Sequence, residues 1–259
     1  VTGGGFRLAP LALRIGDGVI RVEGRKDEEA LGGSLRFEAM PLAVSGLFFD
    51  PALAGRLDGT LDLAGTPEAP EMEARLAVSE GRLAVEAATN LAPLEATLTA
   101  HLKGGRLESS LTATMDGAAT LNMEGNAPFP LQLRPWSFDM PASAPISGNA
   151  SWELSTKPIM DVLGIAEHYL DASITGACAV DGTVAAFAAS GDAYIKDGYY
   201  ENSLTGMQLK HIKAHFRANG PVVRLEECSA EMGSNGDVKA TGELRLLPSE
   251  HFPFTVRAE

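Results

Sequence analysis

The sequence predicts a mainly β protein, built from repeated antiparallel meanders with one or two short helices. Apolar and polar residues alternate over many short stretches, as they do in a strand with one buried face. The chain of 259 residues also contains 28 Gly and 15 Pro, which is consistent with many turns between such strands. In addition, one strand pair recurs later in the chain, which indicates an internal repeat.

The repeat begins with two predicted strands over 59–65 and 74–83, in which apolar residues alternate with polar or small ones. The pattern returns at a constant offset of 117 residues, and the matched positions are Gly59 and Gly176, Gly65 and Gly182, Thr66 and Thr183, Val78 and Ile195, and Gly81 and Gly198. We therefore expect three segments: a partial N-terminal repeat over 1–56, a first module over 57–170 and a second, partial module over 171–259.

The first 40 residues predict three or four strands. Leu11, Leu13 and Ile15 alternate with other residues, and Asp17-Gly18 is a hairpin signal before the next alternating run. Residues 40–56 do not alternate strictly, so we expect a short helical or irregular turn there.

Residues 94–124 give the clearest strand pattern, with three alternating runs separated by Gly-containing turns. This is the pattern of an antiparallel meander with one apolar and one solvated face. A Pro-rich connection follows over 126–150, with a short strand at 131–133. Residues 157–170 predict a helix, because apolar residues recur there at helical spacing and Pro158 suits an early helical position.

The second meander begins near residue 172 and runs to residue 246. Its apolar parity slips between Leu209 and Ile212, which predicts a β-bulge. Cys178 and Cys228 both lie on predicted strands. They are either two small buried residues or, in an oxidising compartment, a possible disulfide, and the sequence does not give the distance between them.

The charge balance and the missing motifs exclude several function classes. The chain has 34 acidic and 21 basic residues, a formal net charge of −13. This balance disfavours a phosphate-binding surface, and with it nucleic-acid binding, because such sites need Lys and Arg to replace counterions; it indicates a solvated polar face. No Gly-rich nucleotide-binding motif and no nucleophile elbow is present. His211 and His215 are expected to face solvent, and Glu226 and Glu227 to point to opposite faces of a strand. We therefore predict no enzyme activity, no metal and no cofactor.

A long meander with a continuous apolar face must cover that face by closure, by a second sheet or by a ligand. Small residues on this face suit either a curved sheet around an acyl chain or ordinary sheet-on-sheet packing. The predicted apolar face, and hence the candidate lipid groove, is formed by Leu94, Leu98, Leu102, Leu107, Leu111, Met115, Leu121 and Met123, and in the second copy by Ile195, Leu225, Val238 and Leu244.

Two segments carry a family resemblance. The stretch from Leu57 to Thr66, followed by 74–83, resembles the repeat of the TamB and AsmA-like proteins. The stretch Gly176–Gly182, leading into 191–202 with its Gly-Tyr-Tyr-Glu-Asn end, resembles it too. The similarity covers most of residues 35–259, in motifs made mainly of Gly, Thr and alternating Leu.

This resemblance implies a fold, a place and a function. The fold would be a long, curved, U-shaped sheet whose groove carries phospholipid acyl chains between the inner and outer membranes. The chain would be an internal periplasmic piece of a protein anchored in the inner membrane of a Gram-negative bacterium. Other parts of that protein would contact an outer-membrane partner of the TamA (Omp85) type and assist outer-membrane protein assembly. The family has no known catalytic residues.

Two further expectations remain open at this stage. The rival function is a structural or adhesive β-sandwich module of a surface or secreted protein. The edge strands of an excised piece would also be free to pair with those of a second copy, giving an edge-to-edge dimer.

Overall fold

The structure is a computed structural model that describes residues 5–27, 30–47, 53–83, 91–163, 167–233, 236–246 and 252–259. It confirms the mainly β class predicted from the alternation of apolar and polar residues. The described strands are β1 (Phe6–Ile15), β2 (Gly18–Lys26), β3 (Leu31–Pro41), β4 (Leu53–Gly65), β5 (Pro70–Leu83), β6 (Leu94–Lys103), β7 (Arg106–Met115), β8 (Ala119–Pro128), β9 (Leu131–Leu133), β10 (Trp136–Phe138), β11 (Pro145–Ser155), β12 (His168–Thr183), β13 (Phe187–Asn202), β14 (Met207–Gly220), β15 (Val222–Met232), β16 (Gly236–Arg245) and β17 (Phe254–Ala258).

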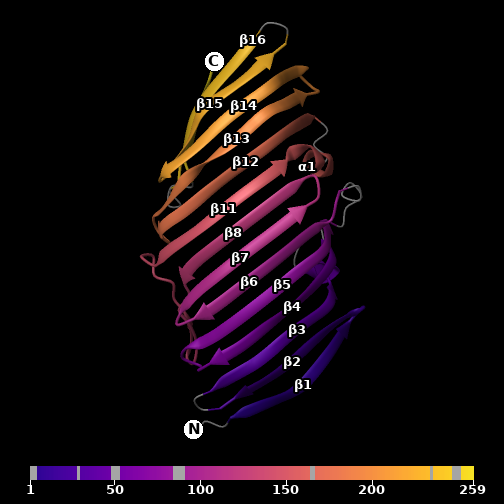
Figure 1. The fold of residues 1–259 in the computed structure, drawn as a ribbon, viewed down its shortest axis with the longest axis vertical. Helices are drawn as coiled ribbons and strands as arrows, with labels where there is room; N and C mark the ends of the chain where they lie inside the picture. Colours follow the sequence, from indigo (N-terminus) through magenta and orange to yellow (C-terminus); the bar gives the residue numbers. More distant parts are fainter. Residues whose placement is uncertain are drawn as a thin grey trace. The chain divides into compact units, whose positions relative to one another are not determined.

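Fifteen of these strands form one open sheet in the order in which they occur in the chain, β1 to β8 followed by β11 to β17 (Figure 1). Strands β9 and β10 form a separate two-stranded antiparallel sheet. An open sheet has two edges, and here they are β1 and β17. The predicted antiparallel meander is therefore confirmed.

Helical structure is short. The described helices are a 3-10 helix, η1 (Leu42–Leu47), in the segment expected to be a helical or irregular turn, and α1 (Thr156–Leu163). The predicted helix over 157–170 was too long, because strand β12 already begins at His168. Residues 164–166 of that prediction lie outside the described residues. No helix in the described parts of the chain has the length and apolar character needed to cross a membrane.

Contacts divide the chain into two units, which we describe separately. Unit 1 comprises residues 1–86, 93–113 and 124–144, and unit 2 comprises residues 87–92, 114–123 and 145–259. In unit 1, cross-strand partners place apolar residues opposite apolar or small ones on one face of the sheet. One such row crosses six strands, through Leu13, Ile20, Phe37, Gly59, Leu76 and Leu98.

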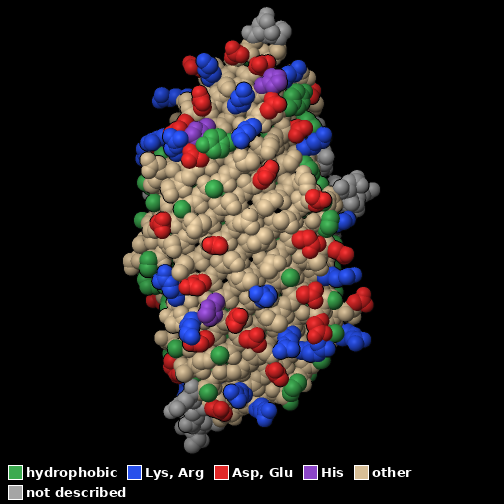
Figure 2. Space-filling model, in the orientation of Figure 1, with side chains coloured by type: hydrophobic (Ala, Val, Ile, Leu, Met, Phe, Trp, Pro, Cys, Tyr) green, Lys and Arg blue, Asp and Glu red, His purple; other side chains and the backbone are tan. Residues whose placement is uncertain are grey.

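Unit 2 has the same alternation over its own strands. One apolar row crosses from β11 to β17 through Leu154, Ile174, Ile195, Ala214, Cys228, Ala240 and Ala258. The intervening positions carry polar and charged residues, for example Thr175, Tyr194 and His215 in adjacent strands. Figure 2 shows a face of the molecule on which acidic and basic side chains are frequent and hydrophobic ones occur mostly singly.

The 117-residue repeat is present in the backbone as well as in the sequence. Gly65 and Gly182 both adopt a positive φ, at 90° and 126°, which a residue with a side chain adopts only with strain. The following threonines make the same turn: the hydroxyl of Thr66 accepts a hydrogen bond from the Ala69 N–H at 3.1 Å, and that of Thr183 accepts one from the Ala186 N–H at 3.2 Å. Strands β4 and β5 are thus repeated as β12 and β13.

A bulge recurs at the same offset. Glu80 and Asp197 lie 117 residues apart, and both have a φ of 55°. In each copy the pairing with the next strand slips by one residue here, between Val78 and Gly81 and between Ile195 and Gly198. A bulge of this kind lets the strand continue with its apolar residues on the original face.

Candidate functional site

The apolar face of the sheet is the first candidate site, because little covers it. Among the described residues, and apart from Pro67 and Pro70, the buried hydrophobic ones are Met40, Leu102 and seven alanines: Ala74, Ala118, Ala144, Ala172, Ala189, Ala214 and Ala230. The larger apolar residues on this face are mostly half-buried against their strand neighbours. In the described parts of the chain, such a face lacks the second layer that normally buries a sheet.

The accessible surface supports this description. It amounts to 16196 Å² for the 27.2 kDa chain. A fully compact monomer of this mass would expose about 10,900 Å², and two separate compact bodies of half the mass would expose about 13,100 Å² together. The excess therefore does not depend on how the two units are placed.

Seven of the sequence-predicted groove residues lie on the apolar face, opposite apolar or small residues of a paired strand. In unit 1, Leu94, Leu98 and Leu102 oppose Gly81, Leu76 and Met72 on β5. In unit 2, Ile195 opposes Ile174, Leu225 opposes Phe216, Val238 opposes Ala230, and Leu244 opposes Val223 and Phe254. Leu107, Leu111 and Met115 occupy alternate positions of β7, and Leu121 and Met123 alternate positions of β8.

One of these residues does not fit a ligand-binding role. Leu102 is only 1% exposed, so it cannot contact a ligand on the surface, whereas Leu98, four residues earlier on β6, is 36% exposed. The β9–β10 hairpin lies near this end of unit 1: the N–H of Leu133 donates to the carbonyl of Pro67 at 2.7 Å, and Pro67 is itself fully buried. The hairpin thus contacts the end of unit 1 that carries the β4–β5 turn.

The apolar faces extend to both edge strands. On β1, in unit 1, five apolar side chains are at least 38% exposed, namely Phe6, Leu8, Leu11, Leu13 and Ile15. On β17, in unit 2, Phe254 is 76% exposed and Val256 is 59% exposed. Among the described strands, each edge therefore has a neighbour on one side only and carries exposed apolar side chains.

The possible disulfide is not formed. Cys178 and Cys228 are both free thiols. They lie on the same face but on β12 and β15, with β13 and β14 between them, so the strand spacing alone separates them by about 14 Å. A disulfide needs Cα atoms within about 7 Å. Burial raises the pKa of the Cys228 thiol, as expected for a small residue on the apolar face.

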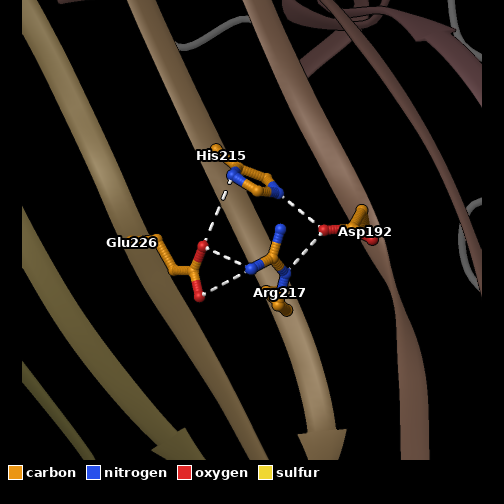
Figure 3. Close-up of polar contacts among 4 residues, drawn as sticks. All are labelled: Asp192, His215, Arg217 and Glu226. Atoms are coloured by element: carbon orange, nitrogen blue, oxygen red, sulfur yellow. Dashed lines mark hydrogen bonds and ion pairs between the residues drawn. The ribbon is translucent and has the colours of Figure 1, made fainter.

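A polar network on the opposite face of unit 2 is the second candidate site (Figure 3). The ring Nε2 of His215 lies 2.6 Å from Asp192 Oδ1, and its Nδ1 lies 3.6 Å from Glu226 Oε2. Arg217 joins the same two carboxylates, at 3.1 Å from Asp192 and 3.2 Å from Glu226. His215 also stacks on the ring of Tyr194, with centroids 4.6 Å apart.

Two expectations from the sequence are wrong here. His215 does not face solvent freely, since its side chain is only 19% exposed, whereas His211, paired with Asp197 at 2.6 Å, is 59% exposed. Glu226 and Glu227 do not point to opposite faces. The pairing of β14 with β15 slips between His215 and Phe216, and this bulge leaves both glutamates exposed while Leu225 and Cys228 keep the apolar face.

The network has a simple electrostatic consequence. The hydrogen bond from His215, and then that from Arg217, lowers the pKa of Asp192 below its ordinary value. The hydrogen bond to Asp192 and the charge of Glu226 raise the pKa of Arg217. The network joins three neighbouring strands, and no nucleophile among the described residues lies beside the histidine. In the described residues, no group of three or more His, Cys, Asp or Glu side chains is arranged to hold a metal ion.

Comparison with known proteins adds no relative to this description. No protein-family model, curated protein or solved structure matches the chain.

Proposed function

We propose that this chain is a non-enzymatic segment whose apolar sheet face binds phospholipid acyl chains, as part of a periplasmic protein of the TamB and AsmA-like type that transfers lipid between membranes. The observation that supports this proposal is the uncovered apolar face, which continues from strand to strand within each unit. An acyl chain bound here would remove apolar surface from water, and each Å² removed would stabilise the complex by about 25 cal/mol.

The rival proposal, a β-sandwich module, needs two sheets packed face to face. The described strands form one sheet of fifteen strands and one of only two, so no comparable second sheet covers the first. Assistance to outer-membrane protein assembly, with an Omp85-type partner bound by other parts of a longer protein, belongs to the same proposal.

The test is native mass spectrometry of the purified protein, followed by organic extraction and lipid analysis. We expect near-stoichiometric phospholipid with the wild type, and its loss in L98D, since Leu98 is exposed on the apolar face. T97D is the matched control, because Thr97 is the exposed neighbour on the opposite face of the same strand. It adds the same charge and should retain lipid.

Two results would contradict the proposal. One is a lipid-free wild type that also takes up no added phospholipid. The other is an equal loss of lipid in L98D and T97D. That result would show that an added negative charge weakens lipid binding on whichever face of the sheet it lies. Circular dichroism of all three proteins checks that each remains folded.

A further inference from the structure

The polar face of unit 2 carries a concavity that the acyl-binding proposal does not use. It has a volume of about 550 Å³ and lies over β15, β16 and β17. Its wall includes three arginines from three adjacent strands, Arg224, Arg245 and Arg257, together with Glu243 and two threonines, Thr241 and Thr255. The volume is in the range of small-ligand sites.

The strand pairing explains why these side chains converge. Arg224 on β15 opposes Glu243 on β16, which in turn opposes Thr255 on β17. Arg257 opposes Thr241 in the neighbouring row. Since side chains at paired positions lie on the same face, all five point toward the polar side of the sheet.

Positive charge in the concavity is only partly neutralised. Arg224 and Arg245 share one carboxylate, that of Glu243, and each reaches it through its Nε, at 3.5 and 3.4 Å. The side chain of Arg257 has no hydrogen bond or ion pair with any described residue. Glu226, also in the wall, is held by Arg217. A guanidinium has five N–H donors in a planar fork, so most donors of these three arginines remain for a ligand.

We propose that this concavity binds a phosphate group. Guanidinium groups match phosphate oxygens in pairs of parallel hydrogen bonds, and the threonine hydroxyls at positions 241 and 255 add neutral donors. A chain with a net charge of −13 repels anions on average, so a local cluster of arginines facing one concavity is the place where an anion would be retained.

Two sources of phosphate fit this chemistry: a phospholipid headgroup and a small phosphate ester. Phe254 and Val256, on the other face of the same edge strand, are exposed and could contact acyl chains of a lipid that reaches around the edge. The inference goes beyond acyl binding on the sheet, because the concavity would bind phosphate whether or not the apolar face binds lipid.

The experiment is a titration followed by NMR of the arginine Nε–H groups at low ionic strength, with two probes that carry the same phosphomonoester. Glycerol 3-phosphate represents the small ester, and dihexanoyl phosphatidic acid, kept monomeric, represents the lipid. The variant R245Q/R257Q should weaken binding about tenfold or more. The control K213Q/K239Q removes two positive charges from the polar positions of β14 and β16 outside the concavity and should weaken it by no more than about twofold.

Each result has a definite meaning. Equal affinity for both probes assigns the site to small phosphate esters, and tighter binding of the lipid, reduced in F254S, assigns it to a headgroup. The proposal is overturned if neither probe binds, or if the two double variants weaken binding equally. L98D, in which we expect the bound phospholipid to be lost, should leave the glycerol 3-phosphate titration unchanged, so the two proposals can fail separately.

Discussion

Leu98 and Leu102 provide a direct test of how the apolar face is covered. Both lie on the same face of β6, four residues apart. They differ in burial, because Leu98 is 36% exposed and Leu102 is 1% exposed. Replacing each by Ala removes the same three carbon atoms. The two substitutions therefore compare an open site with a closed one in the same strand.

The expected decreases in the free energy of unfolding follow from this difference in burial. Full burial of three carbons contributes about 2.4 kcal/mol at about 0.8 kcal/mol per methylene. L98A should lose roughly two thirds of that, about 1.5 kcal/mol, with no cavity because the vacated space is open to water. L102A should lose the whole amount plus a cavity term, about 3.5 kcal/mol in all.

The assay is urea unfolding followed by circular dichroism, with the midpoint compared at constant slope. Phospholipid uptake, measured on the same samples, should fall in L98A and remain unchanged in L102A. Losses of stability that agree to within about 0.5 kcal/mol would refute the reasoning, because they would show that the two sites are equally covered.

Three other predictions follow from single contacts. The carboxylate of Asp192 should titrate below its ordinary pKa, so its contribution to stability is present above about pH 4 and lost as the pH falls through the lowered value; carbon-13 NMR should show this pKa rising in R217Q. Cys178 and Cys228 should still react as two free thiols after mild oxidation. A monomer lighter by two hydrogens would contain a disulfide between them and would contradict the strand order. G176V should destabilise the protein, because a Cβ at Gly176 would lie 2.5 Å from the Trp152 ring, and an unchanged thermal midpoint would argue against that packing.

Periodicity and local turn chemistry were sufficient to predict much of the fold. The alternation at 94–102 identified the apolar side of β6 because successive side chains of a strand point to opposite faces. The repeat was also visible, since Gly65 and Gly182 each begin the same Gly-Thr turn. These features depend on residues close together in the chain.

Other features depend on which strands are neighbours, and the sequence does not contain that information locally. Glu226 joins His215 only because of a bulge between two paired strands. The separation of Cys178 from Cys228 follows from the two strands between them. The arginine concavity was missed because the sequence argument used the net charge of the whole chain. The three arginines come together only when β15, β16 and β17 lie side by side. The helix at 157–170 was extended too far, since its apolar spacing continued into a strand.

The meandering strand order has a consequence for how the protein opens. Within each unit a strand is held mainly by the strand before it and the strand after it, so its protection depends on its nearest neighbours, as in a repeat array. Amide hydrogen exchange should then follow position in the sheet, fastest at β1 and β17 and slower strand by strand toward the interior of each unit. Such a sheet loosens progressively from its ends, and a ligand that spans several strands would slow exchange across all of them together.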